Sequence, residues 1–310
     1  ESSPAEYPAT SKSKQKSFFY PSVGASVVLS ELIKMPEQIG YLKLRGSWAS
    51  VGLPFGRFLA YPTFKWDSST GAFSSQSAYP LYNLKPERTD SWEVGITTRF
   101  LKFFSLDLSY YRTRTFNQTM DAKLQPTGGY STFYAQTGDV RNQGVELSLG
   151  FKNTWNHFIW ETNYTFSANR NKILSLIDGY INPVTGQEVT KERLDVGGLA
   201  NARFILKEGG SLGDLYSVKD LRRDSNGKIY LDKTGNVQII NSKDIHLGSV
   251  FPKANMAWRN DFSWKNWHCG FLLTARLGGV VYSATQALLD SYGVSEVSAI
   301  ARDNGGVQIN

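Results

Sequence analysis

Pairs of alternating segments joined by very short turns are the feature of this chain that most restricts its fold. In the clearest pair, mostly apolar side chains take every second position from Trp92 to Phe100, and the alternation returns from Phe104 to Tyr110 after a turn at residues 101–103. Polar residues, some of them charged, fill the positions between. Side chains alternate across a strand with a period of two, so each limb has one apolar and one polar face. A tilted strand of about ten residues can cross a bilayer, and the pair therefore predicts a transmembrane β-hairpin.

The same unit recurs along the chain. Residues 145–166 turn at 153–156, residues 256–277 turn at 265–267, and a less regular pair over 23–48 turns at Met35–Pro36. The pattern predicts about eight membrane strands. Long segments rich in Gly, Ser, Pro, Asn and Tyr separate the pairs, over residues 50–89, 115–142 and 169–253. Short turns on one side and long loops on the other are typical of outer-membrane barrels, in which the long loops face outside.

Composition supports an all-β chain. The mean hydropathy is −0.33, and the 310 residues include no run of about eighteen apolar residues, which excludes a helical membrane protein. Aromatic residues make up 14% of the chain. Four tryptophans near the short turns predict an aromatic belt at the inner membrane interface: Trp155, Trp160, Trp264 and Trp267. The single cysteine, Cys269, forbids an intrachain disulfide and falls in phase with apolar residues of its strand.

Motifs for covalent chemistry are absent from the sequence. No nucleophile elbow, phosphate loop or dinucleotide fingerprint occurs, and the three histidines (His157, His246 and His268) have no metal-ligand spacing. The segment 224–235 has calcium-loop-like spacing but has Gly235 where an EF-hand has its closing glutamate, so an Asn-Gly turn is the better interpretation. The net charge of +7 is spread along the chain and does not indicate a nucleic-acid partner. We expect neither an enzyme nor a bound cofactor or metal.

Several motifs follow one another from about Phe18 to Asn310. They are Tyr41–Trp48, Leu84–Gly95, Asn142–Leu147, Asp244–Lys253 with Trp258–Asn266, Ala275–Gly279 with Leu289–Ser295, and Ala301–Val307. In this order they resemble the motifs of SusC/RagA-type TonB-dependent outer-membrane transporters. Ordered motifs along one chain are far more specific than any single one of them.

The resemblance implies a 22-stranded barrel with an N-terminal plug and a TonB box that couples it to the inner membrane. It also implies a SusD-like surface lipoprotein as a lid, and import of glycans or peptides. No signal peptide, plug, TonB box or terminal aromatic strand is found, and the chain ends in a polar loop at Asn310. We therefore expect residues 18–310 to be an internal part of the barrel, with residues 1–17 as an extracellular loop or tail. The plug and about fourteen strands would lie elsewhere in the same polypeptide or in another chain.

Two sets of residues are candidates for function within that barrel. The polar face is expected to line the lumen and contact the plug, through Glu93, Arg99, Asp107, Glu146 and Lys152. Aromatic residues of the long loops could contact substrate or lid, although exposed tyrosines also pack loop on loop; they are Phe64, Trp66, Tyr79, Tyr82, Tyr130, Phe133 and Tyr134.

A soluble β-sandwich, acting as a carbohydrate-binding protein or adhesin, is the alternative to the barrel. In a sandwich the apolar faces would meet each other instead of lipid. Eight strands cut from a larger barrel would have two unpaired edges, which a bilayer cannot satisfy, so the barrel interpretation predicts that residues 1–310 do not fold stably alone.

Overall fold

The structure is a computed structural model that describes residues 19–53, 65–74, 78–79, 85–123, 132–181, 186–199 and 202–306. It divides into two compact units. Unit 1 comprises Glu1–Leu194, Lys207–Gly210 and Pro252–Leu277, and unit 2 comprises Asp195–Leu206, Ser211–Phe251 and Gly278–Asn310.

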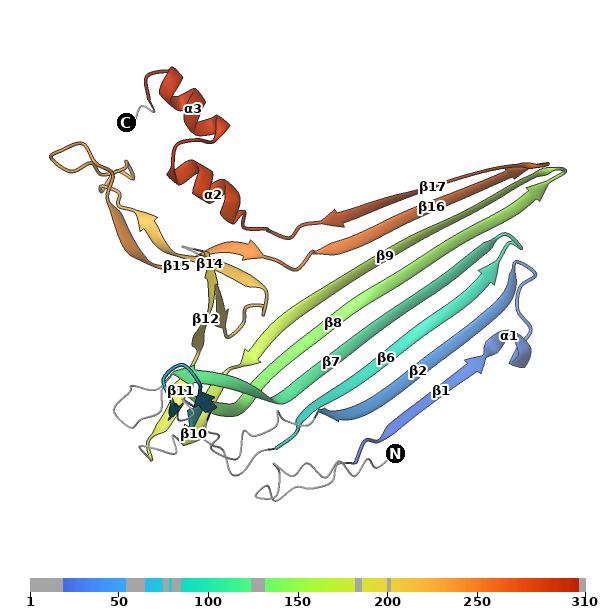
Figure 1. Cartoon of the computed structure of the whole chain (residues 1–310). Helices are drawn as coiled ribbons and strands as arrows, with labels where there is room; N and C mark the ends of the chain where they lie inside the picture. The colour runs from blue at the N-terminus through green and yellow to red at the C-terminus, as the bar shows by residue number, and fades with distance from the viewer. Residues whose placement is uncertain are drawn as a thin grey trace. The chain divides into compact units, whose positions relative to one another are not determined.

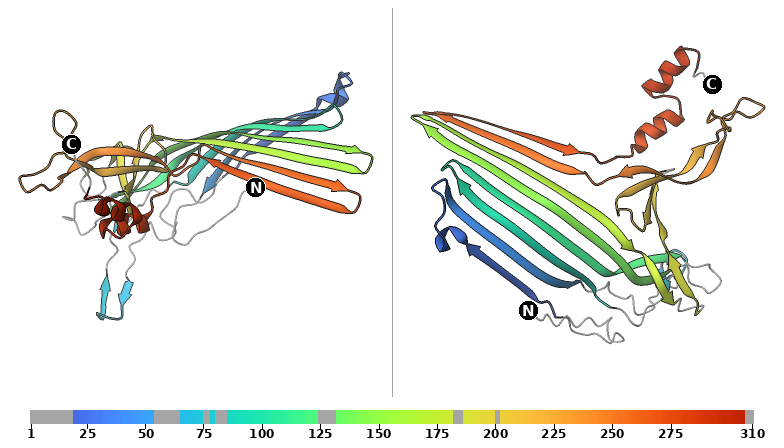
Figure 2. Two further views of the ribbon diagram at one scale, coloured as in Figure 1. Left: turned by 90° about the horizontal axis from the view of Figure 1, so that it is seen from above. Right: turned by 180° about the vertical axis from the view of Figure 1, so that it is seen from behind.

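Eight long strands of unit 1 form one sheet in the order β1-β2-β6-β7-β8-β9-β16-β17 (Figure 1). Every neighbouring pair along this order is antiparallel. Figure 2 shows the same strands side by side from two further directions. The number of strands agrees with the predicted eight. Their bounds are Ser22–Val28, Ile39–Leu53, Glu87–Phe100, Phe104–Lys123, Thr132–Trp155, Phe158–Ser175, Ala254–Trp264 and Trp267–Leu277.

Three of the four hairpin turns lie where the alternation predicts them. β6 and β7 are joined by residues 101–103, β8 and β9 by 156–157, and β16 and β17 by 265–266. Leu101, Lys102, Asn156 and Lys265 have positive φ angles, between 51° and 61°. Short hairpin turns need such backbone conformations to match the right-handed twist of the flanking strands.

The first hairpin differs from the prediction at its turn. Alternation places Leu29 in the strand, but β1 ends at Val28 and a short helix, α1, spans Leu29–Leu32. The backbone N–H of Ile33 donates to the carbonyl of Leu29 at 3.0 Å and closes the helical turn. The chain therefore leaves the sheet before Pro36 and re-enters it at β2.

Direct cross-strand pairing gives the sheet two chemically distinct faces, because paired residues project to the same side. One complete row is apolar from β1 to β17: Val27, Leu44, Ile96, Leu108, Leu147, Phe166, Met256 and Ala275. We call the side that carries this row the apolar face and the other side the polar face.

Aromatic residues gather on the apolar face near the short turns. Trp155, Phe158, Trp264 and Trp267 are partners in successive strands. The rings of Trp155 and Phe158 stack with centroids 6.1 Å apart. Trp267 is 75% exposed, although a tryptophan of a soluble domain is usually well buried. This exposed belt at one end of an apolar face is what a membrane interface favours.

The strands β7, β8 and β9 have 20, 24 and 18 residues, well beyond the predicted ten. At their far ends the polar face changes character and carries the buried cross-strand partners Val140 and Ile173, and the buried residues Leu176 and Ile177 follow directly after β9. Residues 207–210 cover part of this buried group, since the N–H of Gly209 donates to the carbonyl of Ile173 at 2.9 Å. Alternation of polar and apolar residues could not show these extensions, because the otherwise apolar face carries charged residues there, such as Arg141 and Lys172, while the polar face carries apolar ones.

Shorter strands complete unit 1. β3 and β4 pair as a small hairpin, β5 pairs with β8 in parallel, and β10 pairs with β11. Their bounds are Lys65–Asp67, Ala72–Ser74, Ala78–Tyr79, Ile177–Ile181 and Glu188–Lys191.

Unit 2 is built on a four-stranded sheet in the order β12-β13-β14-β15. Two helices, α2 and α3, replace the polar loop expected before Asn310, and the hydroxyls of Ser283 and Ser295 cap their first turns. Eight-residue helices are too short to show a clear period in sequence. None of the helices in the described ranges is long and apolar enough to cross a membrane. The bounds are Arg193–Leu199, Ala202–Lys207, Asp214–Leu221, Ile239–Ser249, Ala284–Ser291 and Glu296–Asp303.

The main sheet is open at both edges within the described part of the chain. β1 pairs only with β2, and β17 pairs only with β16. All eleven residues of β17 are exposed. Each outer edge therefore presents unpaired backbone donors and acceptors, as one part of a larger closed barrel would.

Candidate functional site

A continuous polar row crosses the polar face of unit 1, one pairing step from the apolar row. From β2 to β17 its members are Arg45, Gly95, Ser109, Glu146, Ser167, Asn255 and Arg276. Each strand from β2 to β17 contributes one residue, because backbone pairing holds neighbouring strands in register. Residues as far apart in sequence as Arg45 and Arg276, which are separated by 231 positions, thus form a single strip.

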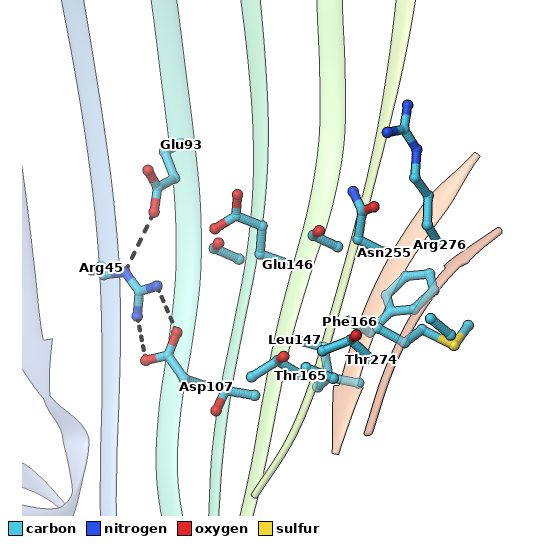
Figure 3. Close-up of a pocket in the computed structure, with 16 residues that line it drawn as sticks. Arg45, Glu93, Asp107, Glu146, Leu147, Thr165, Phe166, Asn255, Thr274 and Arg276 are labelled. Carbon is cyan, nitrogen blue, oxygen red and sulfur yellow. Dashed lines mark hydrogen bonds and ion pairs between the residues drawn. The ribbon is translucent and has the colours of Figure 1, made fainter. Parts of the chain in front are cut away.

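A cavity of about 700 Å³ borders this row (Figure 3). Glu93, Asp107 and Glu146 lie toward one side of it, and Asn255 and Arg276 toward the other. Leu147, Phe166 and Met256 also border the cavity, although their pairing register assigns them to the apolar face. The cavity thus offers carboxylates at one side and a guanidinium at the other, an arrangement suited to polar or zwitterionic groups.

Arg45 is the centre of the hydrogen-bond network in the cavity. Its Nη2 donates to Asp107 Oδ1 at 2.8 Å and its Nη1 to Asp107 Oδ2 at 3.0 Å, which makes the pair bidentate. Nη1 also donates to the hydroxyl of Thr97 at 2.9 Å, and that hydroxyl donates to Asp107 Oδ2 at 2.6 Å. Glu93 adds a longer ion pair at 3.6 Å from Arg45 Nε (Figure 3).

Gly95 makes this network possible. Arg45 is on β2 and Asp107 is on β7, so the guanidinium must cross the intervening strand β6. A Cβ atom at Gly95 would lie 2.5 Å from Arg45 Cζ and 2.8 Å from its Nη2. The side chain of Arg45 therefore occupies the space that any other residue at position 95 would fill.

The other two charged residues assigned to the lumen lie on the same face, outside the cavity lining. Arg99 pairs with Tyr41 and Ser105, and its guanidinium carbon lies 5.6 Å from the centroid of the Tyr41 ring. Lys152 donates to Glu161 at 2.7 Å. All five predicted charges thus share one face, and its role as the lumen wall stays a prediction.

The loop aromatics fall into three groups. Trp66 lies in β3, is 57% exposed, and meets Phe73 edge to face with centroids 4.9 Å apart. Tyr79 and Phe133 are backbone partners of β5 and β8, and Tyr134 follows in β8. Phe64, Tyr82 and Tyr130 lie outside the described residues. Contact with substrate or lid stays a prediction for all seven.

The segment 224–235 of unit 2 forms tight turns. The N–H groups of Asn226 and Lys228 donate to Asp224 Oδ1, and those of Thr234 and Asn236 donate to Asp232 Oδ1. The hydroxyl of Thr234 and the N–H of Asn236 hold the pKa of Asp232 below its ordinary value, because they stabilise the charged carboxylate. These oxygens are thus used within the turns. No cluster of metal-ligating side chains occurs in the ranges that the structure describes.

Sequence reasoning missed several residues of the site. Arg45, Asn255 and Arg276 were not among the candidate lumen charges, although each stands between apolar neighbours in its strand. The alternation of these polar residues with apolar ones was the signal that could have assigned them to the polar face. Their grouping into one cavity depends on pairing between β2, β6, β16 and β17, which no local pattern encodes.

Comparison with known proteins decides the family. The family model described as "TonB dependent receptor-like, beta-barrel" matches residues 2–279, most of the chain. The chain belongs to the TonB-dependent receptor family. The main sheet of the receptor is thus part of an outer-membrane β-barrel, and the soluble β-sandwich alternative is wrong. A receptor barrel also agrees with the expectation that the chain is not an enzyme.

Two curated relatives come from Formosa agariphila. TonB-dependent receptor P3 is 25% identical over 305 residues, covering 88% of this chain and 29% of the relative. TonB-dependent receptor P26 is 28% identical over 287 residues, covering 86% of this chain and 28% of the relative. The receptor chain therefore spans less than a third of the length of the curated relatives it matches.

Solved structures agree in fold. A structure of the RagAB peptide importer in its "open-open" state matches with a TM-score of 0.62 at 17% identity, covering 86% of this chain and 29% of that one. A structure of the RagAB peptide transporter also matches with a TM-score of 0.62, at 18% identity, covering 84% of this chain and 29% of that one. The fold of the main sheet is thus similar to that of the RagAB structures, in agreement with the resemblance of the sequence motifs to SusC/RagA-type transporters.

Proposed function

We propose that the receptor takes part in TonB-dependent active import of a nutrient oligomer, a glycan or a peptide, across the outer membrane. The observation that carries the proposal is the sheet with two faces: an apolar face with an aromatic belt, and a polar face with a charged cavity. In a closed barrel the apolar face meets lipid and the polar face encloses the lumen. The family match supports transport, and the RagAB structures support a transporter architecture.

In this proposal the polar row is the lumen wall. Glu93, Asp107 and Glu146 present carboxylates, and Arg99 and Lys152 add cations nearer the short turns. A wide barrel needs a plug to close it, and movement of the plug needs energy from the TonB complex. The plug and the contact with TonB would be supplied by parts of the receptor outside this chain.

A SusD-like lipoprotein is the proposed partner at the extracellular mouth. The structure of the RagAB peptide importer, which is similar in fold, supports a second protein at the receptor. The loop aromatics, such as Trp66 with its exposed ring, would contact the substrate or this lid. Aromatic faces are able to stack on sugar rings and on apolar peptide side chains.

Uptake in the native bacterium tests the proposal. A strain without the receptor is grown on defined glycans and peptides, and accumulation of labelled oligomers is measured with and without a protonophore. We expect one oligomer class to lose energy-dependent uptake, and plasmid-borne receptor to restore it. Unchanged uptake of every oligomer would overturn the import function. Affinity purification of the full-length receptor from membranes, followed by mass spectrometry, tests separately for the lipoprotein.

A further inference from the structure

The apolar face ends in a group of cations at the end of β7, β8 and β9 that is remote from the short turns. We call it the cationic rim. Its members are Arg112 and Arg114 on β7, Arg141 on β8, and Arg170 and Lys172 on β9. Register places all five on the apolar face, since Arg112 follows Leu108 and Tyr110 at steps of two. Each side chain is at least partly exposed.

Three of these cations oppose one another directly. Arg114 is the cross-strand partner of Arg141, and Arg141 is the partner of Lys172. Like charges in directly opposed positions destabilise a sheet, because their Cβ atoms are only about 5 Å apart. We expect a row of opposed cations to be tolerated where an anion from outside the chain offsets their mutual repulsion.

Acidic side chains of the chain compensate only part of this charge. Arg114 Nε donates to both carboxylate oxygens of Asp139 at 3.0 Å. Within the described ranges, no carboxylate lies within ion-pair distance of Arg112, Arg141 or Arg170. Arg112 and Arg141 are partly exposed and Arg170 is exposed. These side chains are therefore open to an anion from outside the chain, apart from the Nε of Arg141, which is buried without a hydrogen-bond partner in the described residues.

The position of the rim matches a lipid headgroup region. Directly below it, Trp92 and Tyr110 contact with ring centroids 5.3 Å apart, as in an aromatic girdle. Arg141 is ten residues along β8 from Phe151, which belongs to the aromatic group near the short turns. Ten residues at about 3.4 Å each, tilted by about 40°, rise roughly 26 Å, close to the height of the apolar band of such barrels.

We propose that the cationic rim binds the phosphate groups of anionic lipids in the outer leaflet of the outer membrane. Guanidinium groups suit phosphate because their paired N–H donors match its oxygens. Arg112, Arg141 and Arg170 would contact the headgroup, while the acyl chains would lie along the apolar row below. The inference rests on the apolar face being the lipid face, and it is independent of the nutrient that the barrel imports.

The test uses the full-length receptor, purified in mild detergent, and a diphosphorylated lipid A as the probe. The variant combines Arg112→Gln, Arg141→Gln and Arg170→Gln. Its matched control combines Lys102→Gln and Lys265→Gln, two exposed cations of the short turns at the opposite end of the strands. Bound lipid is counted by native mass spectrometry, and its affinity is measured at low and high salt.

We expect the affinity of the rim variant for lipid A to fall by roughly a hundredfold, since each cation near an anionic surface contributes about a fivefold factor. The control should match the wild type. Lipid A should raise the Tm of the wild type but not that of the rim variant, whose lipid-free Tm should be equal or higher because like charges are removed. Equal lipid binding by variant and wild type would overturn the proposal. The proposal would also be overturned if the rim variant lost affinity for dephosphorylated lipid as strongly as for lipid A. Binding of free inorganic phosphate without binding of lipid A would overturn it as well.

Discussion

Arg45 and Asp107 form a bidentate ion pair although their strands, β2 and β7, are not neighbours. The guanidinium passes over Gly95 of the strand between them. The ion pair thus links β2 to β7 at the wall of the cavity, and it can do so because Gly95 of β6 has no side chain in its path.

Gly95→Ala should displace the guanidinium of Arg45 and leave the sheet intact. The new methyl group would lie 2.5 Å from Arg45 Cζ, which is too close, and the flexible end of the arginine can move away. An electron-microscopy structure of the full-length variant should show the bond to Asp107 broken. The control is Gly46→Ala, where an added Cβ would meet only the Glu93 carbonyl at 3.9 Å. Retention of the bidentate pair in Gly95→Ala would contradict the steric argument.

The coupling between Arg45 and Asp107 should be modest. Their side chains are 29% and 44% exposed, so water screens the pair, and we expect a coupling free energy of about 1 kcal/mol. The measurement is a double-mutant cycle with Arg45→Gln and Asp107→Asn, read by reversible unfolding of the full-length receptor. A coupling free energy near zero would contradict this expectation and show that the ion pair does not contribute to the stability of the receptor.

Leu147→Arg should be far more destabilising than Glu146→Arg. Leu147 belongs to the middle of the apolar row, where an arginine facing lipid costs about 2–4 kcal/mol. Glu146 is its neighbour on the polar face and is exposed beside the cavity. The two variants differ by one position and are compared by folding yield in lipid vesicles and by urea unfolding. Equal yields and equal unfolding midpoints would contradict the assignment of the two faces.

Residues 1–310 expressed alone should not form a closed barrel. The outer edges of β1 and β17 have no partner strands within the described residues, and a bilayer cannot hydrogen-bond them. Unheated and heated samples should therefore migrate alike on a denaturing gel, whereas the full-length receptor should show a heat-dependent shift. A heat-resistant compact band from residues 1–310 would refute this expectation.

Local alternation was sufficient to predict eight strands, three of the hairpin turns and the composition of both faces. Leu108, Leu147 and Phe166 could be assigned to one face because the period of two is a property of each strand by itself. The helices α2 and α3 and the sheet of unit 2 were not predicted, because their elements are short and their side chains alternate weakly.

What this sequence determines by itself is therefore the family, the strands and which side of each strand is apolar. The tertiary structure alone decided which charges meet. Whether Arg45 contacts Asp107, or Arg141 lies opposite Arg114 and Lys172, depends on cross-strand register between segments many residues apart. A shift of two residues would preserve both faces and the hydrophobic pattern, so only the paired backbone and its turns select the network and the cationic rim.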